Sequence, residues 1–235
     1  MTLKTIVNEA QDTLALPRSN VVVSSTDQNV RLLLAVAQQE GRQLMRRYNW
    51  QALTTEKTFT SVAQAEQTSA IPTDFDRIVN GSMFNRSQTR RVAGPLSANE
   101  WQAQQAITAS VLTDAFRIQG NNILIVPVPE AGDTYAYEYV SKNFCTNAAG
   151  STGQAAWAAD DDLGVLDEPL MLLGVIWRFR KARGFDYAEE FSTYEREATQ
   201  LAMRDGGKRT VNYGGDASLL DQTLGPLVIE GSWNL

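Results

Sequence analysis

The chain has 235 residues, of which 43% are hydrophobic and 20% are charged, and its formal net charge is −6. This composition excludes a disordered or fibrous protein, and the length suffices for one sizeable core or for a core with an inserted subdomain. The chain has no histidine and only one cysteine, Cys145. Catalytic Ser-His-Asp and Cys-His systems, His- or Cys-ligated metal sites and disulfides therefore cannot form within one chain. We expect Cys145 to be an ordinary buried or half-buried thiol.

Neither a signal peptide nor a membrane segment is expected. The first residues enter a helical pattern directly, without the basic and then apolar regions of a signal peptide. The longest apolar run, residues 170–177, is far shorter than the roughly 20 residues that cross a bilayer. The chain should therefore act where it is made.

The negative charge lies in the last third of the chain. Residues 1–159 carry 13 acids and 13 bases, whereas residues 160–235 carry 14 acids and 8 bases. The window 77–91 contains four arginines and no acid. Such uneven charge can bring charged partners to different faces of a protein, although a solvated surface with scattered charge is the simpler alternative.

Apolar residues at helical spacing predict two helices near the start of the chain. The first has about 13 residues and ends before Pro17. The second follows N-cap candidates in residues 24–27. Its apolar stripe consists of Val30, Leu33, Leu34, Ala37, Gly41, Leu44, Met45 and Tyr48. Glycine costs a helix roughly 1 kcal/mol against alanine, so Gly41 on this stripe indicates close approach by another helix.

Residues 41–53, with the sequence GRQLMRRYNWQAL, join this second helix to a strand pattern. The segment combines three arginines with a tyrosine and a tryptophan. Arginine and large aromatic residues are enriched in protein interfaces, and arginine also pairs with phosphate. Because Arg42 and Arg46 lie off the apolar stripe, we interpret the segment as a contact with a partner that it does not by itself identify.

Residues 54–159 are predicted to be rich in β-strands. Strands are expected over residues 55–62, 77–84 and 133–141. Glycine first in the pair Gly120-Asn121, between two apolar runs, predicts a tight hairpin. Ser97 followed by Glu100 is a capping box and predicts a short helix.

Helical periodicity returns near residue 167. Asp167 is the expected N-cap of a buried helix that becomes basic before Gly184, and Asp186 with Glu189 should cap a last helix. Residues 168–204 are therefore expected to form an αα-hairpin. Beyond residue 206 the chain is polar and glycine-rich, with an apolar patch over residues 224–229.

These elements predict an α+β protein. Residues 1–53 and 160–205 should form a helical bundle, and residues 54–159 a β-rich insert with one short helix. Residues 206–235 should form an extended C-terminal arm.

Two motifs suggest chemistry, and each has a simpler interpretation. Asp160, Asp161 and Asp162 could hold Mg²⁺ or Ca²⁺, but they lack the spacing of a calcium loop, so a solvated loop or a docking patch is favoured. The glycine-rich stretches 149–153 and 206–210 lack the P-loop spacing. No cofactor and no metal are expected.

Several blocks, in their order and spacing, resemble a known family. They are GRQLMRRYNWQAL, EKTFT, IPTDFDRIVNGSMFNR, GPLSANEWQ, FRIQGNNILIVPVP with YEYVSKN, LDEPLMLLGVIWRFRKARGFDYAEEF and RDGG. Together they resemble the head-to-tail adaptor proteins of tailed bacteriophages, in particular the tail tubular protein A type. The likeness covers about residues 25–207 of the chain.

The resemblance implies a structural protein without catalytic residues. Such adaptors form a ring, commonly of twelve copies, that joins the portal protein to a tail tube or nozzle protein and leaves a central channel for DNA. The protein would then belong to the neck and tail of the virion, and its assembly would take place in the host cytoplasm. A C-terminal extension commonly reaches the portal. DNA would pass through the channel without sequence-specific contacts. An acidic or neutral channel wall would help it slide, since fixed cations are what retain phosphates.

Two sets of candidate contact residues follow. The candidates for contacts between subunits are Arg42, Arg46, Arg47, Trp50, Arg77, Arg86, Arg90, Arg91, Asp160, Asp161 and Asp162. In the arm, the candidates for docking to the portal are Tyr213, Leu219, Leu220, Leu224, Leu227, Val228, Ile229 and Trp233.

The sequence is also compatible with two other functions. A virion-associated glycosidase would need two carboxylates in one cleft, chosen from Asp74, Asp76 and Glu138. A nonspecific DNA-binding module would use the arginines and nearby aromatic residues, although the chain is acidic overall.

Overall fold

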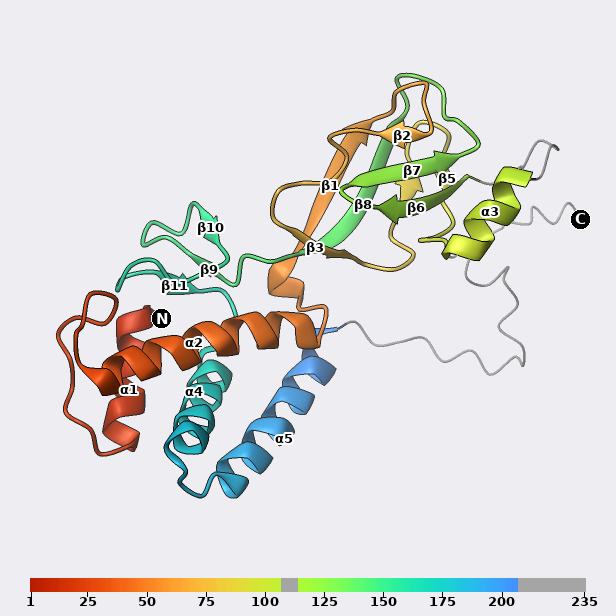
Figure 1. The fold of residues 1–235 in the computed structure, drawn as a ribbon. Coiled ribbons are helices and arrows are strands. Elements are labelled where there is room, and N and C mark those ends of the chain that lie inside the picture. The colour runs from red at the N-terminus through yellow and green to blue at the C-terminus, as the bar shows by residue number, and fades with distance from the viewer. Residues whose placement is uncertain (107–113, 207–235) are drawn as a thin grey trace, which may run out of the picture. The chain divides into compact units, whose positions relative to one another are not determined.

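The computed structural model describes residues 1–106 and 114–206, and its mixture of helices and antiparallel sheets confirms the predicted α+β class (Figure 1). These residues divide into two compact units. The helical unit consists of residues 1–57, 72–79 and 138–206, and the β unit consists of residues 58–71, 80–106 and 114–137. The predicted boundaries at residues 53 and 160 stay predictions. All but the first residue of the expected C-terminal arm lies outside the described residues.

Four long helices build the helical unit: α1 (Leu3–Thr13), α2 (Gln28–Arg47), α4 (Glu168–Arg183) and α5 (Ala188–Asp205). Because α4 packs against the other three, it needs apolar residues almost all round its axis. The Asp167 carboxylate caps α4 as predicted, accepting a hydrogen bond from the N–H of Leu170 at 3.0 Å. Gly184 ends the helix in the left-handed conformation, with φ 75°.

The predicted capping box at the start of α5 is wrong. Tyr187 occupies the N-cap, so Asp186 lies one residue too early for that role. Its carboxylate instead accepts a hydrogen bond from the N–H of Ala188, two residues on, at 3.1 Å. This is the local turn that aspartate often forms in place of a cap.

The close approach predicted at Gly41 is present, but its partner is not a helix. A Cβ atom at this position would lie 2.3 Å from Cε2 of Phe144, which is completely buried. Phe144 follows the strand β8 (Thr134–Ser141) and precedes β9 (Cys145–Thr146). Antiparallel pairing of β9 with β10 (Gly153–Gln154) and β11 (Leu163–Gly164) makes a small sheet in the helical unit.

A five-stranded sheet has the order β1-β8-β4-β5, with β3 also paired to β8. Its other strands are β1 (Thr54–Thr60), β3 (Phe75–Ile78), β4 (Phe84–Asn85) and β5 (Arg90–Arg91). Strands β1 and β8 each contain residues of both units. The single strand predicted over residues 77–84 is wrong, because β3 ends at Ile78 and Gly81, with φ 77°, lies in the turn before β4.

The β unit also contains the sheet β2-β7-β6 and the short helix α3 (Ala98–Ala106). The predicted hairpin joins β6 (Ala115–Gln119) to β7 (Asn122–Val126), and β2 (Glu66–Gln67) pairs with β7. Gly120 has the positive φ, 61°, that this tight turn requires. The capping box is confirmed too, since the N–H of Ser97 donates to the Glu100 carboxylate at 2.7 Å and the N–H of Glu100 donates to the Ser97 hydroxyl at 3.3 Å.

Candidate interaction surfaces of the helical unit

The exposed face of α2 is cationic. Arg31, Arg42 and Arg46 are exposed and lie on one side of the helix. Arg42 and Arg46 are four positions apart and so share a face, and the 11 positions from Arg31 to Arg42 make about three full turns. The only acid in α2, Glu40, is completely buried. Arg46 keeps 71% of its side chain exposed and approaches the Asp76 carboxylate only at 4.0 Å. We call these three arginines the cationic face of α2.

Arg47, in contrast, is engaged inside the helical unit. Its guanidinium makes two hydrogen bonds to the Glu195 carboxylate, one of them at 2.8 Å, and its Cζ lies 5.6 Å from the ring centres of Tyr48 and Tyr194. The hydrogen bonds from Arg47 lower the pKa of Glu195, and they raise the pKa of Arg47. Arg47 therefore joins α2 to α5 within one chain.

Trp50 and Arg77 also have structural roles. Trp50 is only 5% exposed, and its indole N–H donates to the Leu44 carbonyl at 2.7 Å. The Arg77 guanidinium donates to the carbonyls of Tyr48 at 2.6 Å and Met45 at 3.1 Å, and it pairs with Asp76 at 2.7 Å. A cation at these carbonyls caps the C-terminal end of α2.

A buried polar cluster that the sequence pattern did not predict joins three helices. The Glu40 carboxylate of α2 accepts hydrogen bonds from Arg178 Nε of α4 at 2.6 Å and from the Tyr194 hydroxyl of α5 at 2.7 Å. A Cβ atom at Gly174 would lie 2.2 Å from Cδ of Glu40, so glycine at this position makes room for the carboxylate. Burial raises the pKa of Glu40, although Arg178 and Tyr194 act in the opposite direction. One sequence signal was present, since Glu40 lies at helical spacing between the apolar positions 37 and 44.

The acidic run is largely structural. The Asp160 carboxylate accepts hydrogen bonds from the N–H groups of Val22 at 3.0 Å and Val23 at 2.7 Å. Asp162 is 2% exposed, and its carboxylate accepts hydrogen bonds from the N–H groups of residues 158 and 159. Asp161 is the exposed member. Among the described residues, no group of three or more His, Cys, Asp or Glu side chains is arranged to hold a metal ion.

The remaining arginine candidates belong to the β unit. Arg86 is exposed, whereas Arg90 and Arg91 are half-buried. Arg90 pairs with the buried Asp114 at 3.4 Å, and the Arg91 guanidinium lies where a side chain at Gly81 would be. Of these three arginines, only Arg86 is exposed.

The carboxylates considered for glycoside hydrolysis have other partners. Asp74 accepts hydrogen bonds from the hydroxyls of Ser141 at 2.7 Å and Tyr139 at 3.1 Å, and burial together with the Asp74 charge raises the pKa of Tyr139 to about 12. Asp76 pairs with Arg77, and Glu138 is exposed on β8. Asp74 and Asp76 thus stabilise the junction of β3, β8 and α2, and the cavities described below are lined by other residues.

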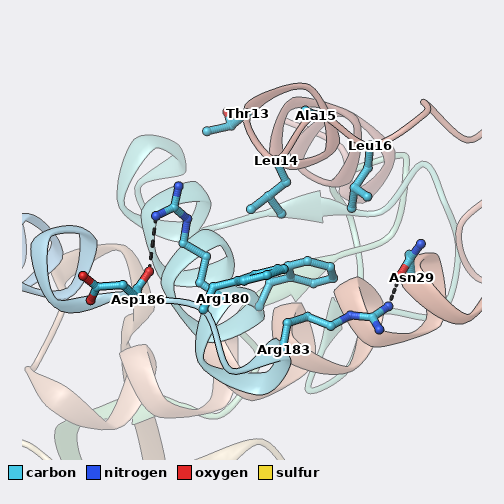
Figure 2. Close-up of a pocket in the computed structure, with 10 residues that line it drawn as sticks. Thr13, Leu14, Ala15, Leu16, Asn29, Arg180, Arg183 and Asp186 are labelled. Carbon is cyan, nitrogen blue, oxygen red and sulfur yellow. Dashed lines mark hydrogen bonds between the residues drawn. The ribbon is translucent and has the colours of Figure 1, made fainter.

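A cavity of about 630 Å³ lies where the end of α1 meets the turn between α4 and α5 (Figure 2). Leu14 and Leu16 line one side of it, and Arg180 and Arg183 line the other. The remaining lining residues are Thr13, Ala15, Asn29, Phe179, Phe185 and Asp186. We call this cavity the α4–α5 groove. Two smaller cavities, of about 290 and 220 Å³, lie beside Trp50 and beside Arg47.

The arm candidates from Tyr213 to Trp233 lie outside the described residues. Within the two described stretches, none of the helices combines the length and apolar composition needed to cross a membrane.

Comparison with known proteins found one match, to a protein-family model. No curated protein matches the sequence. The family model described as SU10 adaptor protein matches residues 1–219, which comprise both units and the first part of the expected arm. This match supports the resemblance to phage adaptors, although it does not single out the tail tubular protein A type. The chain therefore belongs to the SU10 adaptor protein family, and it is a structural adaptor protein of a bacteriophage.

Proposed function

We propose that this adaptor forms a ring, of twelve copies as in the tail tubular protein A type, between the portal protein and the tail. The ring would enclose a channel through which DNA passes without sequence-specific contacts. Family membership implies a component of the virion neck or tail that meets portal and tail. The ring, its copy number, the channel and assembly in the host cytoplasm are parts of the proposal.

The cationic face of α2 is the observation that carries the ring. The helical unit is acidic outside residues 1–57, yet α2 presents three exposed arginines and no exposed acid. A surface of this kind fits a second surface of opposite charge on the next copy, such as one that contains the exposed Glu189 of α5 or the exposed Asp161. Contact between two different surfaces of identical subunits is heterologous, and it closes into a ring when the rotation permits.

Charge reversal on α2 tests this contact. The double variant Arg42→Glu/Arg46→Glu should keep the fold, since both side chains are exposed, and should lose ring assembly on the portal. Electron microscopy of the adaptor mixed with portal protein is the measurement, and a ring on the tail side of the portal is the result expected for the unchanged chain. Normal rings from the double variant would remove these arginines from the interface.

Arg47 provides a matched control for that experiment. It belongs to the same turn of α2, but its guanidinium is already paired with Glu195. Arg47→Glu should therefore lower the stability of the helical unit, in contrast to the double variant. Equal thermal midpoints for the two variants would contradict this division between interface and core.

The C-terminal arm is proposed to dock to the portal. Residues 224–235 combine an apolar patch with Trp233, and large aromatic residues are typical anchors of protein interfaces. Deletion of residues 208–235 should leave the thermal midpoint of the helical unit unchanged and abolish binding to the portal. Portal binding by the shortened protein would show that the arm is dispensable.

Nonspecific DNA binding is the second candidate, and the cationic face of α2 is the feature that favours it. Phosphate contacts by arginine make affinity fall steeply with salt. Duplex DNA should therefore bind weakly at physiological salt if the face serves the ring. Tight binding that is lost on charge reversal at Arg42 and Arg46 would favour the DNA-binding function instead.

A further inference from the structure

The turn between α4 and α5 holds an exposed phenylalanine in a fixed backbone position. Gly184 has a left-handed φ of 75°, and the N–H of Phe185 donates to the Arg180 carbonyl at 2.9 Å. A hydrophobic residue after such a glycine commonly packs back onto the helix. Phe185 is instead 61% exposed. An exposed aromatic side chain on a fixed backbone costs little conformational entropy when it binds a partner, which is typical of an interface anchor.

The α4–α5 groove continues from this side chain. Leu14 and Leu16 are half-buried beside it, and the buried Phe179 also lines the groove. The groove is therefore mainly apolar, and its volume of about 630 Å³ is large enough for two or three side chains of a peptide.

The charged groups at the rim favour an acidic occupant. Arg180 is paired with Glu190 at 2.5 Å and also donates to the Asp186 carbonyl. The Asp186 carboxylate accepts a hydrogen bond from the N–H of Ala188. Arg183 contacts the neutral side-chain oxygen of Asn29 (Figure 2). Of the groove-lining cations, Arg183 is thus the one with no carboxylate partner among the described residues.

The C-terminal sequence supplies a segment of matching chemistry. After Arg209 the chain has no base, and residues 216–221 read DASLLD, with two leucines between Asp216 and Asp221. The helix α5 has 18 residues and is about 27 Å long, and its last residue is held by a hydrogen bond from the N–H of Gln51 to the Asp205 carboxylate. The ten residue steps from 206 to 216 can extend over about 33–36 Å. The segment can therefore span more than the full length of α5.

We propose that the α4–α5 groove binds residues 216–221 of a second copy of this chain, with Leu219 and Leu220 on the apolar floor and an aspartate on Arg183. This inference rests on the proposed ring and names one contact between neighbouring subunits. A groove on one subunit and a segment on the next form a heterologous pair, as a ring requires. Leu219 and Leu220 then serve the subunit contact, and residues 224–235 remain for the portal.

A peptide-binding experiment tests the assignment. The receptor is the full chain carrying Asp216→Lys/Asp221→Lys, so that its own segment is disabled, and the probe is a fluorescent peptide of residues 210–235. Fluorescence anisotropy should detect binding, and the same charge reversal in the peptide should weaken it. Adding Phe185→Ala to the receptor should weaken binding at least about tenfold, and adding Arg183→Glu about fivefold.

Two control variants outside the groove test whether a loss of peptide binding is specific to the groove. Met203→Ala removes another exposed apolar side chain, 77% exposed, that does not line the groove. Lys181→Glu makes the same charge change in the last turn of α4, also outside the groove lining. Both control receptors should bind the peptide normally. Equal losses in the controls and in the groove variants would overturn the assignment.

The remaining outcomes show which molecule fills the groove and whether the ring proposal fails independently of it. If the unchanged full chain binds the peptide much more weakly than the disabled receptor at every dilution, the groove is filled by the chain's own segment, and the second copy is overturned. If the peptide does not bind but Phe185→Ala impairs portal docking, the groove takes a partner protein. If the peptide binds as expected and no ring forms on the portal, the ring proposal fails and the groove assignment stands.

Discussion

Removal of the Glu40 carboxylate should destabilise the helical unit more than any exposed substitution. Glu40 is 0% exposed, and its two oxygens accept hydrogen bonds from Arg178 and Tyr194. Glu40→Ala would leave a guanidinium whose side chain is 9% exposed without its counter-charge, and a buried hydroxyl without its acceptor. Breaking a buried ion pair by removing one partner costs about 3–5 kcal/mol. We expect the free energy of unfolding to fall by about this amount.

A substitution at Gly174 distinguishes a specific effect on the Glu40 cluster from a general loss of stability. Gly174→Ala alone places a Cβ atom 2.2 Å from the Glu40 side chain and should cost about 1–3 kcal/mol through overpacking, despite the better helix propensity of alanine. In Glu40→Ala the same methyl group enters the space that the carboxylate left. The double variant should therefore lose clearly less than the two single losses together.

The assay is urea unfolding followed by tryptophan fluorescence. The centre of the Trp177 ring lies 4.3 Å from Cζ of Arg178, so the fluorescence of Trp177 is sensitive to changes in this cluster. Asp12→Ala is the control, since Asp12 forms an exposed ion pair with Arg18. If Glu40→Ala shifts the urea midpoint no more than Asp12→Ala does, or if the two effects at Glu40 and Gly174 simply add, the cluster does not stabilise the three helices as argued.

Three further predictions concern single side chains. Gly41→Ala should lower the thermal midpoint by calorimetry, because Phe144 is buried and fills the space that the methyl group needs; a raised midpoint would show that the ring can move. Cys145, whose pKa is raised to about 12 by burial and by the Asp162 charge, should react with a thiol reagent at pH 8 only after unfolding, and rapid reaction of the native protein would contradict its burial. Arg47 lowers the pKa of Glu195, so the pair stabilises the fold above the ordinary glutamate pKa, near 4.3, and this contribution is lost as the pH falls further. Glu195→Gln should therefore have a lower urea midpoint than the unchanged chain at pH 7 and a similar one near pH 3, and a gap that is equal at both values would refute the assignment.

The sequence by itself determined most of the local structure and the class of protein. Periodicity predicts the helices that became α1, α2, α4 and α5, because an amphipathic helix must repeat its apolar residues every three or four positions. Local turn chemistry placed the Ser97 capping box and the Gly120 hairpin, since both depend on residues that are neighbours in the chain. The order of the quoted blocks indicated a phage adaptor, and the match to the SU10 adaptor family supports that class.

Only the tertiary structure decided the roles of individual charged residues. Arg42, Arg46 and Arg47 look alike in the sequence, yet the first two are exposed and the third is paired with Glu195, which is 148 positions away. Arg77 caps α2, and Asp160 and Asp162 bind backbone N–H groups. A charged side chain chooses its partner by distance in space, and contacts between residues far apart in the chain leave no regular pattern in it. Periodicity therefore located the apolar core, while the division of the arginines between core and surface required the packing of α2 against α4 and α5.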